Sequence, residues 1–415
     1  MRNVVWFVLL FAAAVIAAAG LSQNDGLVSI FFGDTRLDVS LNVFVIAVVL
    51  FVVVLHLALK AINALVGMPA RAHEWRALKR ERAAHAALRD AHAEYLAARY
   101  NRAAKAAQQA LALQAEVDVL RGDREFTGLA HLIAAASLHR IQDRRGRDER
   151  AQEVVQLASS ALVASPVLDG AHLLMAEWAL DDRDAERGLE ALRNLPPGVA
   201  RRTQALRLKL QAARMARKPF EALQTARLLA KHQGFSRLAA QSLLRSLASD
   251  VIATARDEEQ LQRAWTSLDH ADRRDVLVAA RAAVRARDLG RVDLGREYIQ
   301  PHWSEITRLD ADERAELAIA LIDCSAGIGS EWLPRVEAAL ASHGQEPAIV
   351  AAAGAVFAER QLWGKARRSL EQAAANTALP GRVRRQALRR LAHIARLEGD
   401  EQRGGDCERA AAAID

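Results

Sequence analysis

The chain has 415 residues, which is enough for two or three ordinary domains or for a membrane anchor joined to one long repeat domain. Its net charge of +7 suits anionic lipid headgroups, acidic protein segments or nucleic acid, and charge alone does not choose between them. Cys324 and Cys407 have neither metal-ligand nor disulfide spacing. From residue 70 onward, alanine, leucine and arginine dominate while glycine, proline and aromatic residues are sparse, which is typical of helices and not of sheets. We therefore expect an all-α soluble part in a reducing compartment.

Two apolar runs near the N-terminus predict a membrane anchor over residues 1–66. Residues 4–21 carry no charged side chain, and a helix of this length crosses a hydrocarbon core of about 30 Å. The second run covers residues 41–60, and Lys60 closes it. A cleaved signal peptide is the alternative interpretation of the first run, because Arg2, a short apolar stretch and three consecutive alanines are typical of such peptides.

The distribution of charge orients this anchor. The loop between the two runs, residues 22–40, has three aspartates and one arginine, whereas basic residues follow the second run. Because cytoplasmic flanks are enriched in Lys and Arg, we predict a two-pass inner-membrane protein with both termini in the cytoplasm and the loop in the periplasm. A basic juxtamembrane helix is expected over residues 67–83. The cations that we expect to face lipid headgroups are Lys60, Arg71, Arg76, Lys79, Arg80 and Arg82.

The loop itself has the pattern of a small β-hairpin. Val28, Ile30 and Phe32 alternate with other residues before Gly33-Asp34, and a similar alternation follows it. Alternation on both sides of a two-residue turn signal predicts two antiparallel strands.

Beyond residue 83, apolar positions recur at helical spacing in segments broken by short polar or Gly/Pro turns, which indicates paired helices. The clearest pair covers residues 347–375, and its spacings match the tetratricopeptide repeat, in which small residues let two helices pack closely. The following repeat has a degenerate second helix, which is typical of a C-terminal cap. The residues that define the packing register are Gly354, Phe357, Ala366, Ala373, Ala103 and Ala110.

Between Val199 and Gly344 the repeat signature is blurred, but helix pairs are still expected. We predict them at residues 199–216 with 219–233, 236–253 with 258–268, 271–287 with 291–300, and 312–325 with 331–342. Since a single repeat cannot bury its own apolar face, residues 84–415 should stack into one tetratricopeptide-like α-solenoid. The concave groove of such a domain binds segments of other proteins.

No motif for catalysis or cofactor binding is present. The sequence has no glycine-rich phosphate loop, dinucleotide fingerprint, HExxH, CxxCH or Gly-x-Ser-x-Gly element, so we predict a protein that is not an enzyme and holds no cofactor or metal. Nucleic acid is not expected either, because few aromatic residues and no reader motif accompany the basic residues.

One basic stripe in the last repeat is a candidate site for an anion or a partner. Guanidinium groups pair well with carboxylates, with lipid phosphates and with the propionates of a tetrapyrrole. A solvated surface of the C-terminal cap is the alternative interpretation. The stripe consists of Arg382, Arg385, Arg389 and Arg396.

The order of these parts resembles the HemY N-terminal-domain family of Gram-negative bacteria, which has two spans, a short periplasmic hairpin, a basic juxtamembrane helix and tetratricopeptide-like pairs. The segments that carry the resemblance are residues 1–6, 27–30, 37–40, 75–80, 100–104 and 362–367. The resemblance implies an inner-membrane protein associated with a late part of protohaem synthesis, without catalytic residues to transfer. Some bacteria use the same label for a flavin-dependent porphyrinogen oxidase, but such an enzyme needs a Gly-x-Gly-x-x-Gly strand–turn–helix near its start, and this sequence has none.

These observations together favour a non-catalytic membrane scaffold or regulator of tetrapyrrole synthesis. Its partners would be other proteins, which the resemblance suggests are tetrapyrrole-synthesis enzymes, together with membrane lipids. Two alternatives stay open. One is a carrier that itself binds haem or a porphyrin, and the other is a repeat adaptor for envelope or cytochrome assembly.

Overall fold

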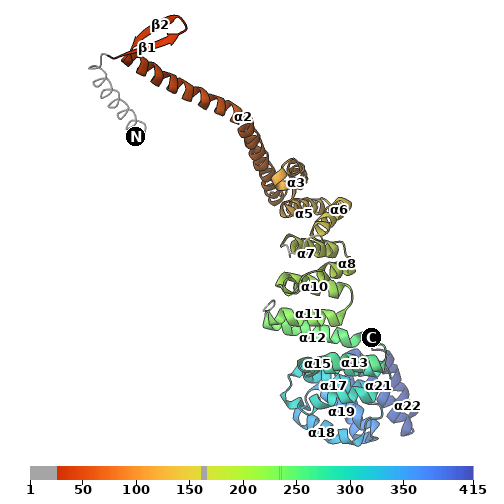
Figure 1. Cartoon of the computed structure of the whole chain (residues 1–415). Helices are drawn as coiled ribbons and strands as arrows, with labels where there is room; N and C mark the ends of the chain where they lie inside the picture. Colours follow the sequence, from red (N-terminus) through yellow and green to blue (C-terminus); the bar gives the residue numbers. More distant parts are fainter. Residues whose placement is uncertain (1–25, 160–165, 233, 235, 415) are drawn as a thin grey trace. The chain divides into compact units, whose positions relative to one another are not determined.

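The computed structural model describes residues 26–159, 166–232, 234 and 236–414 (Figure 1). The first expected span, residues 4–21, lies outside this part of the chain. The chain divides into two compact units, Met1–Glu153 and Val154–Asp415. The first unit includes the expected second span together with the first helices of the array.

The first unit begins with the β-hairpin. Strands β1 (Leu27–Phe32) and β2 (Thr35–Ser40) are antiparallel, and the pairing of Phe32 with Thr35 leaves Gly33 and Asp34 as the turn. Gly33 has a φ of +60°, a conformation that glycine adopts without steric penalty. Glycine at the first position of a two-residue turn is typical of type II′ hairpins.

A single long helix, α2 (Leu41–Leu96), follows the hairpin without a loop. Ser40 ends β2 and also caps α2, because its Oγ accepts a hydrogen bond from the backbone N–H of Val43 at 3.4 Å. The segment Leu41–Ile62 has a mean hydropathy of 2.9 and no buried residue, and in the described part of the chain it is the one helix long and apolar enough to cross a membrane. The expected second span and juxtamembrane helix are therefore two parts of one helix that continues to Leu96.

The last turns of α2 form a small helical core with α3 (Tyr100–Ala115) and α5 (Arg124–Arg140). Alanines dominate the interface, which lets the helix axes approach closely. The short helix α4 (Asp118–Arg121) is held by Gln114, whose side-chain amide donates to the Leu120 carbonyl at 2.8 Å and to Thr127 Oγ1 at 2.8 Å. Helix α6 (Arg144–Ser159) follows α5. The buried alanines of this core are Ala84, Ala87, Ala91, Ala103, Ala107 and Ala110.

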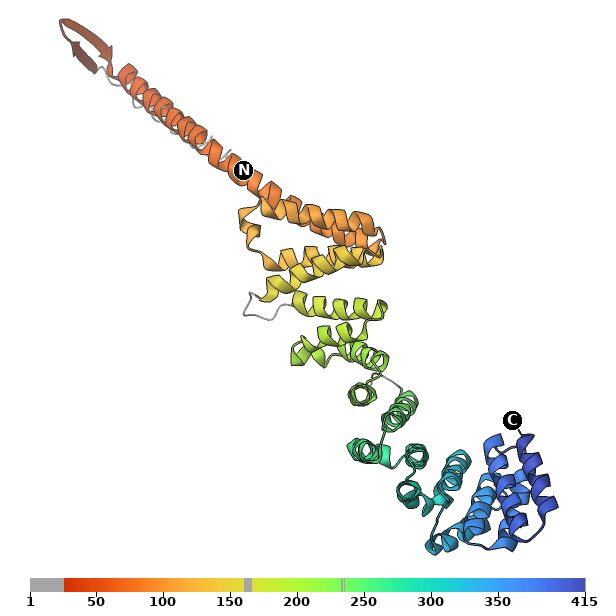
Figure 2. The same ribbon diagram turned by 90° about the vertical axis from the view of Figure 1, so that its right-hand side faces the viewer.

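The second unit is a succession of helices that stack in chain order (Figures 1 and 2). Consecutive helices of its first part are α7 (Pro166–Asp181) and α8 (Ala185–Arg193), α10 (Thr203–Met215) and α11 (Pro219–Lys231), and α12 (Arg237–Ala253) and α13 (Glu258–Ser267). Those of its second part are α15 (Val276–Asp288) and α16 (Val292–Trp303), α17 (Ala311–Asp323) and α18 (Leu333–His343), α19 (Pro347–Glu359) and α20 (Trp363–Ala375), and α21 (Gly381–Leu397) and α22 (Glu401–Ala412). Four short elements connect them: α9 (Pro197–Ala200), α14 (His270–Arg273), η1 (Ile306–Arg308) and η2 (Ser330–Trp332).

The alternate helices of this unit form a continuous layer, because α12 packs on α15, α15 on α17, α17 on α19 and α19 on α21. This order is the arrangement of a helical-repeat array. The helix pairs expected between Val199 and Gly344 are present at nearly the predicted positions, with one difference in packing. Helix α18 packs chiefly against α19 and not against α17. The connection between α17 and α18 contains the buried side chains of Ile328 and Trp332, and Trp332 packs edge-to-face on Trp303.

In the repeat of α19 and α20, the residues that define the packing register lie in close contact. Helix α19 is buried from Ala348 to Phe357. A Cβ added at Gly354 would lie 3.0 Å from the side chain of Leu370 and 3.1 Å from its backbone nitrogen. Ala366 and Ala373 of α20 are also buried. Small residues therefore set the distance between these two helices.

Candidate functional site

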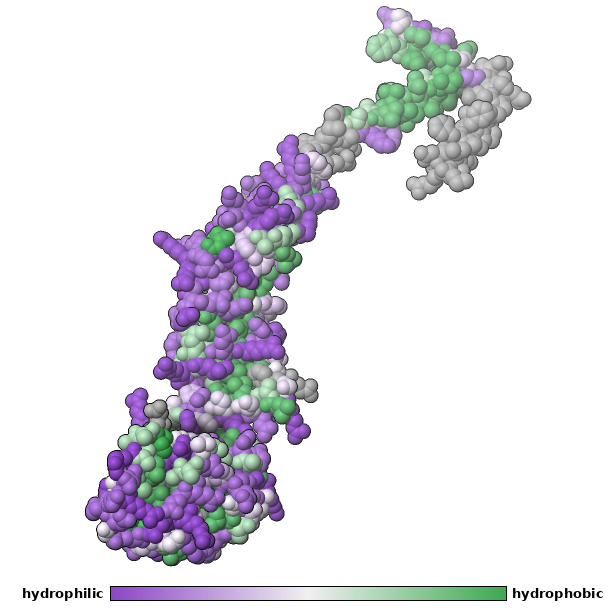
Figure 3. All heavy atoms as spheres, turned by 180° about the vertical axis from the view of Figure 1, so that it is seen from behind, coloured by the Kyte–Doolittle hydropathy of each residue, from purple (hydrophilic) through white to green (hydrophobic). Residues whose placement is uncertain are grey.

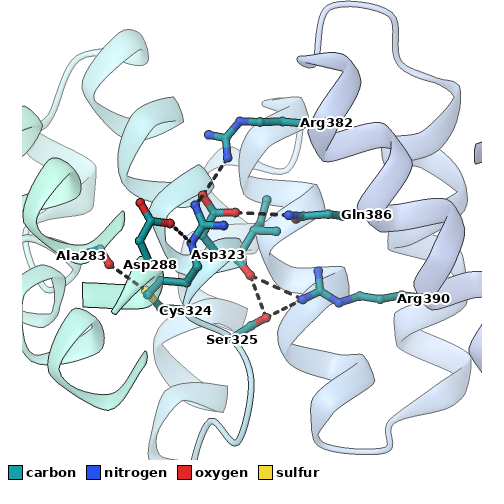
Figure 4. Close-up of polar contacts among 10 residues, drawn as sticks. Ala283, Asp288, Asp323, Cys324, Ser325, Arg382, Gln386 and Arg390 are labelled. Atoms are coloured by element: carbon teal, nitrogen blue, oxygen red, sulfur yellow. Dashed lines mark hydrogen bonds and ion pairs between the residues drawn. The ribbon is translucent and has the colours of Figure 1, made fainter. Parts of the chain in front are cut away.

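The predicted basic stripe lies on α21, and its first residue, Arg382, lies beside the C-terminal end of α17 (Figure 4). Arg382 Nη1 donates to Asp323 Oδ2 at 2.8 Å, and Gln386 Nε2 donates to Asp323 Oδ1 at 3.3 Å. Arg287 of α15 contributes a third contact, at 3.5 Å from Asp323 Oδ2. The side chain of Asp323 is only 1% exposed. A buried carboxylate therefore joins three helices of the layer, and one of its partners is a residue of the stripe.

A second link is made by Arg390, one helical turn after Gln386 on α21. Arg390 Nη2 donates to Ser325 Oγ at 2.6 Å and to the Ile322 carbonyl at 3.4 Å, as Figure 4 shows. Burial lowers the pKa of Arg390, with the charges of Glu359 and Asp323 acting in the opposite direction. The guanidinium supplies donors to the end of α17, where backbone carbonyls have no partner within the helix.

Cys324 lies next to these contacts and is fully buried. Its Sγ donates to the Ala283 carbonyl at 3.4 Å, which joins α17 to α15. Burial raises the pKa of this thiol to about 12. A thiol is nucleophilic only when it is deprotonated, so Cys324 has a structural environment and not that of a reactive cysteine.

The other three stripe residues have different environments. Arg385 Nη1 donates to the Ile414 carbonyl at 3.0 Å, and Arg396 lies 3.5 Å from Glu408 in an ion pair. Arg389 is exposed and makes no hydrogen bond or ion pair with the described residues. The structure thus brings the stripe together on α21 but uses three of its four cations within the chain. Anion binding by the stripe stays a prediction, and Arg389 is the cation left for it.

Two surface hollows lie between successive second helices of the last repeats. The hollow between α18 and α20 has a volume of about 490 Å³ and includes Leu340, Phe357 and Arg368 in its lining. The hollow between α20 and α22 has a volume of about 400 Å³ and includes Leu388 and Cys407 in its lining.

An ion pair crosses the rim of each hollow. Lys365 Nζ donates to Glu337 at 2.8 Å beside the first, and Arg403 pairs with Glu371 beside the second. Each hollow therefore has an apolar floor and a charged rim, which is the surface pattern of a protein interface. The hollows could not be predicted from the sequence, because the ion pairs at their rims, Glu337–Lys365 and Glu371–Arg403, join residues about 30 positions apart.

The cations expected to face lipid are distributed along α2. Lys60, Arg76, Arg80 and Arg82 are exposed and have no acidic partner within the described residues, and Lys79 lies 5.1 Å from the centre of the Trp75 ring. The side chain of Arg71 lies outside the described part of the structure.

The length of α2 limits which of these cations reach headgroups. Arg76 and Arg82 follow Ile62 by 14 and 20 residues, so the helical rise places them about 21 and 30 Å beyond the apolar segment. Attraction to anionic headgroups fades within about 8–10 Å at physiological salt. Lys60 lies within this distance of the headgroups at any tilt of α2. The cations after Trp75 lie within this distance only if α2 leaves the membrane at a low angle to its surface. Otherwise they are available to a protein partner.

No group of three or more His, Cys, Asp or Glu side chains that could hold a metal ion occurs within the described residues. Most of the hydrogen bonds and ion pairs of Figure 4 instead join residues of different helices. What this region offers chemically is a set of charged, apolar-floored surfaces suited to binding other molecules.

Comparison with known proteins adds one family assignment. No curated protein matches the chain. A chain of the solved structure titled "Structure of Naa15/Naa10 bound to HypK-THB" is similar at 13% sequence identity with a TM-score of 0.24, over 76% of this chain and 56% of that chain. This chain thus spans just over half the length of that one, and a TM-score of this size supports no conclusion about fold or function. Residues 26–140, from the hairpin to the end of α5, match the family described as "HemY protein N-terminus", and this segment therefore belongs to the HemY N-terminal-domain family.

Proposed function

We propose that the chain is a non-catalytic inner-membrane scaffold or regulator of protohaem biosynthesis, and that its helical array binds other proteins at the cytoplasmic face. The family of residues 26–140 supports the link to haem synthesis. The acidic loop and the basic residues after Lys60 support the cytoplasmic orientation.

The observation that carries the proposal is the continuity of α2. Its first part, Leu41–Ile62, has the length and exposure of a membrane span, whereas Ala84, Ala87 and Ala91 near its other end are buried in the core with α3 and α5. No flexible linker separates the span from the helical core. The anchor therefore holds this core at a fixed distance from the membrane surface.

Confinement of this kind has a physical consequence for binding partners. Tethering converts an encounter in solution into an encounter at a surface, which raises the effective concentration of partners at the same membrane without any new contact. A scaffold that gathers enzymes of one pathway gains from this effect, and a freely diffusing enzyme does not need it.

The surface of the last repeats supports protein binding more than haem binding. A haem or porphyrin carrier would need free guanidinium groups for the propionates, and Arg382, Arg385 and Arg396 are already engaged within the chain. The hollows beside α20, with their apolar floors and charged rims, suit side chains of a partner.

The test is restoration of haem synthesis in a strain that lacks the protein. Deletion should lower haem or raise its porphyrin precursors. A chain of residues 67–415 keeps Ala84, Ala87 and Ala91 and should fold, but it should not restore haem when expressed at the native level.

The matched control joins residues 67–415 to an unrelated two-pass anchor, which should restore haem. Full restoration by the soluble chain would show that the membrane is unnecessary and would favour a soluble regulator or carrier. Unchanged haem and precursors after deletion would refute the pathway assignment.

A further inference from the structure

The β-hairpin has two chemically different faces. Because strand residues alternate between faces and Ile30 pairs with Leu37, one face consists of Val28, Ile30, Phe32, Leu37 and Val39, with Thr35 at the tip. We call this set the apolar face. The side chain of Phe32 is 86% exposed, and those of Leu37 and Ile30 are also exposed.

The opposite face is mixed: the exposed side chains of Leu27 and Phe31 share it with Ser29, Arg36 and Asp38, and the polar residues are held together by their own contacts. Arg36 Nε donates to Asp38 Oδ1 at 2.9 Å, and Ser29 Oγ donates to the same oxygen at 2.5 Å. The hydrogen bond from Ser29 lowers the pKa of Asp38 most, the hydrogen bond from Arg36 lowers it further, and together they keep the carboxylate charged. The Arg36 guanidinium lies 5.7 Å from the centre of the Phe31 ring, so even the aromatic residue of this face carries a cation.

The apolar face has no partner within the described residues, although an isolated two-stranded hairpin is marginally stable in water. Its position indicates what covers it. The backbone N–H of Leu41 donates to the Gly26 carbonyl at 2.8 Å, so the base of the hairpin is hydrogen-bonded to the first residue of the apolar helix segment. With no loop between hairpin and span, the strands begin at the edge of the hydrocarbon layer.

Figure 3 shows the hydrophobic surface of α2 continuing onto the hairpin. A sheet with one apolar face, one charged face and a base fixed at the membrane edge matches the two sides of a lipid–water interface. Amphipathic helices bind membranes by the same division of faces.

We propose that the hairpin lies on the lipid surface at the outer end of α2, with its apolar face in the lipid interface and the Ser29–Arg36–Asp38 face in water. The occupant of the apolar face is thus the bilayer that α2 crosses, and the inference rests on the proposed membrane insertion of α2. The hairpin then acts as a stop that fixes the depth and rotation of the span, and so the position of the helical core on the other side.

Adjacent residues on opposite faces allow a sharp test. The full chain, with Cys407→Ser, is reconstituted in vesicles of phosphatidylethanolamine and phosphatidylglycerol, and a nitroxide is attached at Phe32→Cys or at Phe31→Cys. Cys324 is buried with a raised pKa and does not take the label. Collision of the nitroxide with oxygen, which concentrates in lipid, is compared with collision with a water-soluble nickel chelate. Val52→Cys, in the span, is the lipid reference, and Leu37→Cys is a second position on the apolar face.

The expected result is that labels at positions 32, 37 and 52 collide preferentially with oxygen and the label at position 31 with the nickel chelate. If position 52 reports lipid but position 32 reports water, the hairpin does not lie on the membrane, although the span does cross it. If position 32 is shielded from both reagents, protein covers the apolar face and the inference fails. If positions 31 and 32 both report lipid, the hairpin has no water-facing side and the inference fails as well. If position 52 reports water, the membrane insertion of α2 is itself refuted.

Discussion

The close packing of α19 on α20 makes Gly354 a sensitive position for the stability of the last repeats. A Cβ there already meets Leu370 at 3.0 Å, and the 3.1 Å approach to the Leu370 backbone nitrogen means that a rotamer change cannot relieve the contact. Gly354→Leu must therefore push the two helices apart. Adding side-chain atoms to a tight contact typically lowers the free energy of unfolding by about 1–3 kcal/mol.

Gly364, in the same repeat, offers a matched control. A Cβ at Gly364 has no neighbour within 4 Å, so Gly364→Leu adds the same side chain without the clash. A loss of about 1–3 kcal/mol corresponds to a roughly 5- to 150-fold increase in the open population. When opening is faster than cleavage, the rate of proteolysis follows this population.

The assay is limited proteolysis of the full chain, with the fragments identified by mass spectrometry. Cleavage within residues 347–415 should accelerate by at least 5-fold in Gly354→Leu, while the first unit remains resistant. In Gly364→Leu the pattern should be that of the unsubstituted chain. Equal proteolysis of the two variants would refute the packing register of this repeat.

Three further predictions test other parts of the account. Asp323→Ala leaves Arg382 and Gln386 without their carboxylate partner and leaves Arg287 paired with Asp288 alone. The local stability of α21 should therefore fall by about 1–3 kcal/mol in hydrogen exchange, a range that allows for the partial exposure of both arginines. Exposed Asp312→Ala is the control, and equal protection of the two variants would argue against a structural role for Asp323. At pH 8 a maleimide should label the native chain once, at Cys407, because Cys324 is buried and its pKa is raised to about 12. The unfolded chain should take two labels. Rapid double labelling of the native chain would contradict the burial of Cys324. A reporter that is active only in the cytoplasm should be active when fused after residue 82 or at the C-terminus. A reporter that is active only in the periplasm should be active when inserted near Asp34, and the reverse pattern would refute the orientation.

Local features of the structure were largely predictable from the sequence. The alternation around Gly33-Asp34 predicts the hairpin, and the helix periodicity predicts most of the helix pairs, because both patterns depend on residues close together in the chain. The second span and the juxtamembrane helix, expected as separate segments, are parts of one helix. Gly67 and Pro69 are helix-breaking residues in the sequence, yet α2 continues through them from the apolar segment to Leu96.

Long-range contacts were not predictable in the same way. Arg382 was expected to be available to an anion, but its partner Asp323 lies 59 residues earlier, and nothing near either residue indicates the pairing. Helix α18 packs on α19 after a connection in which Trp332 packs on Trp303, and the conformation of this connection has no sequence signature. The geometry of stacking decides such contacts, and only the arrangement of several repeats reveals it.

The central claim is that the helical array binds tetrapyrrole-synthesis enzymes at the membrane, and crosslinking in living cells tests it most directly. A photoreactive amino acid at Arg368 or Ala410 places the probe in the lining of each hollow beside α20, and the same residue at exposed Gln262 on α13 is the control. The account predicts that enzymes of haem synthesis crosslink to the first two positions in the membrane fraction and not to the third. Crosslinks to envelope- or cytochrome-assembly proteins instead, or identical products at all three positions, would contradict it.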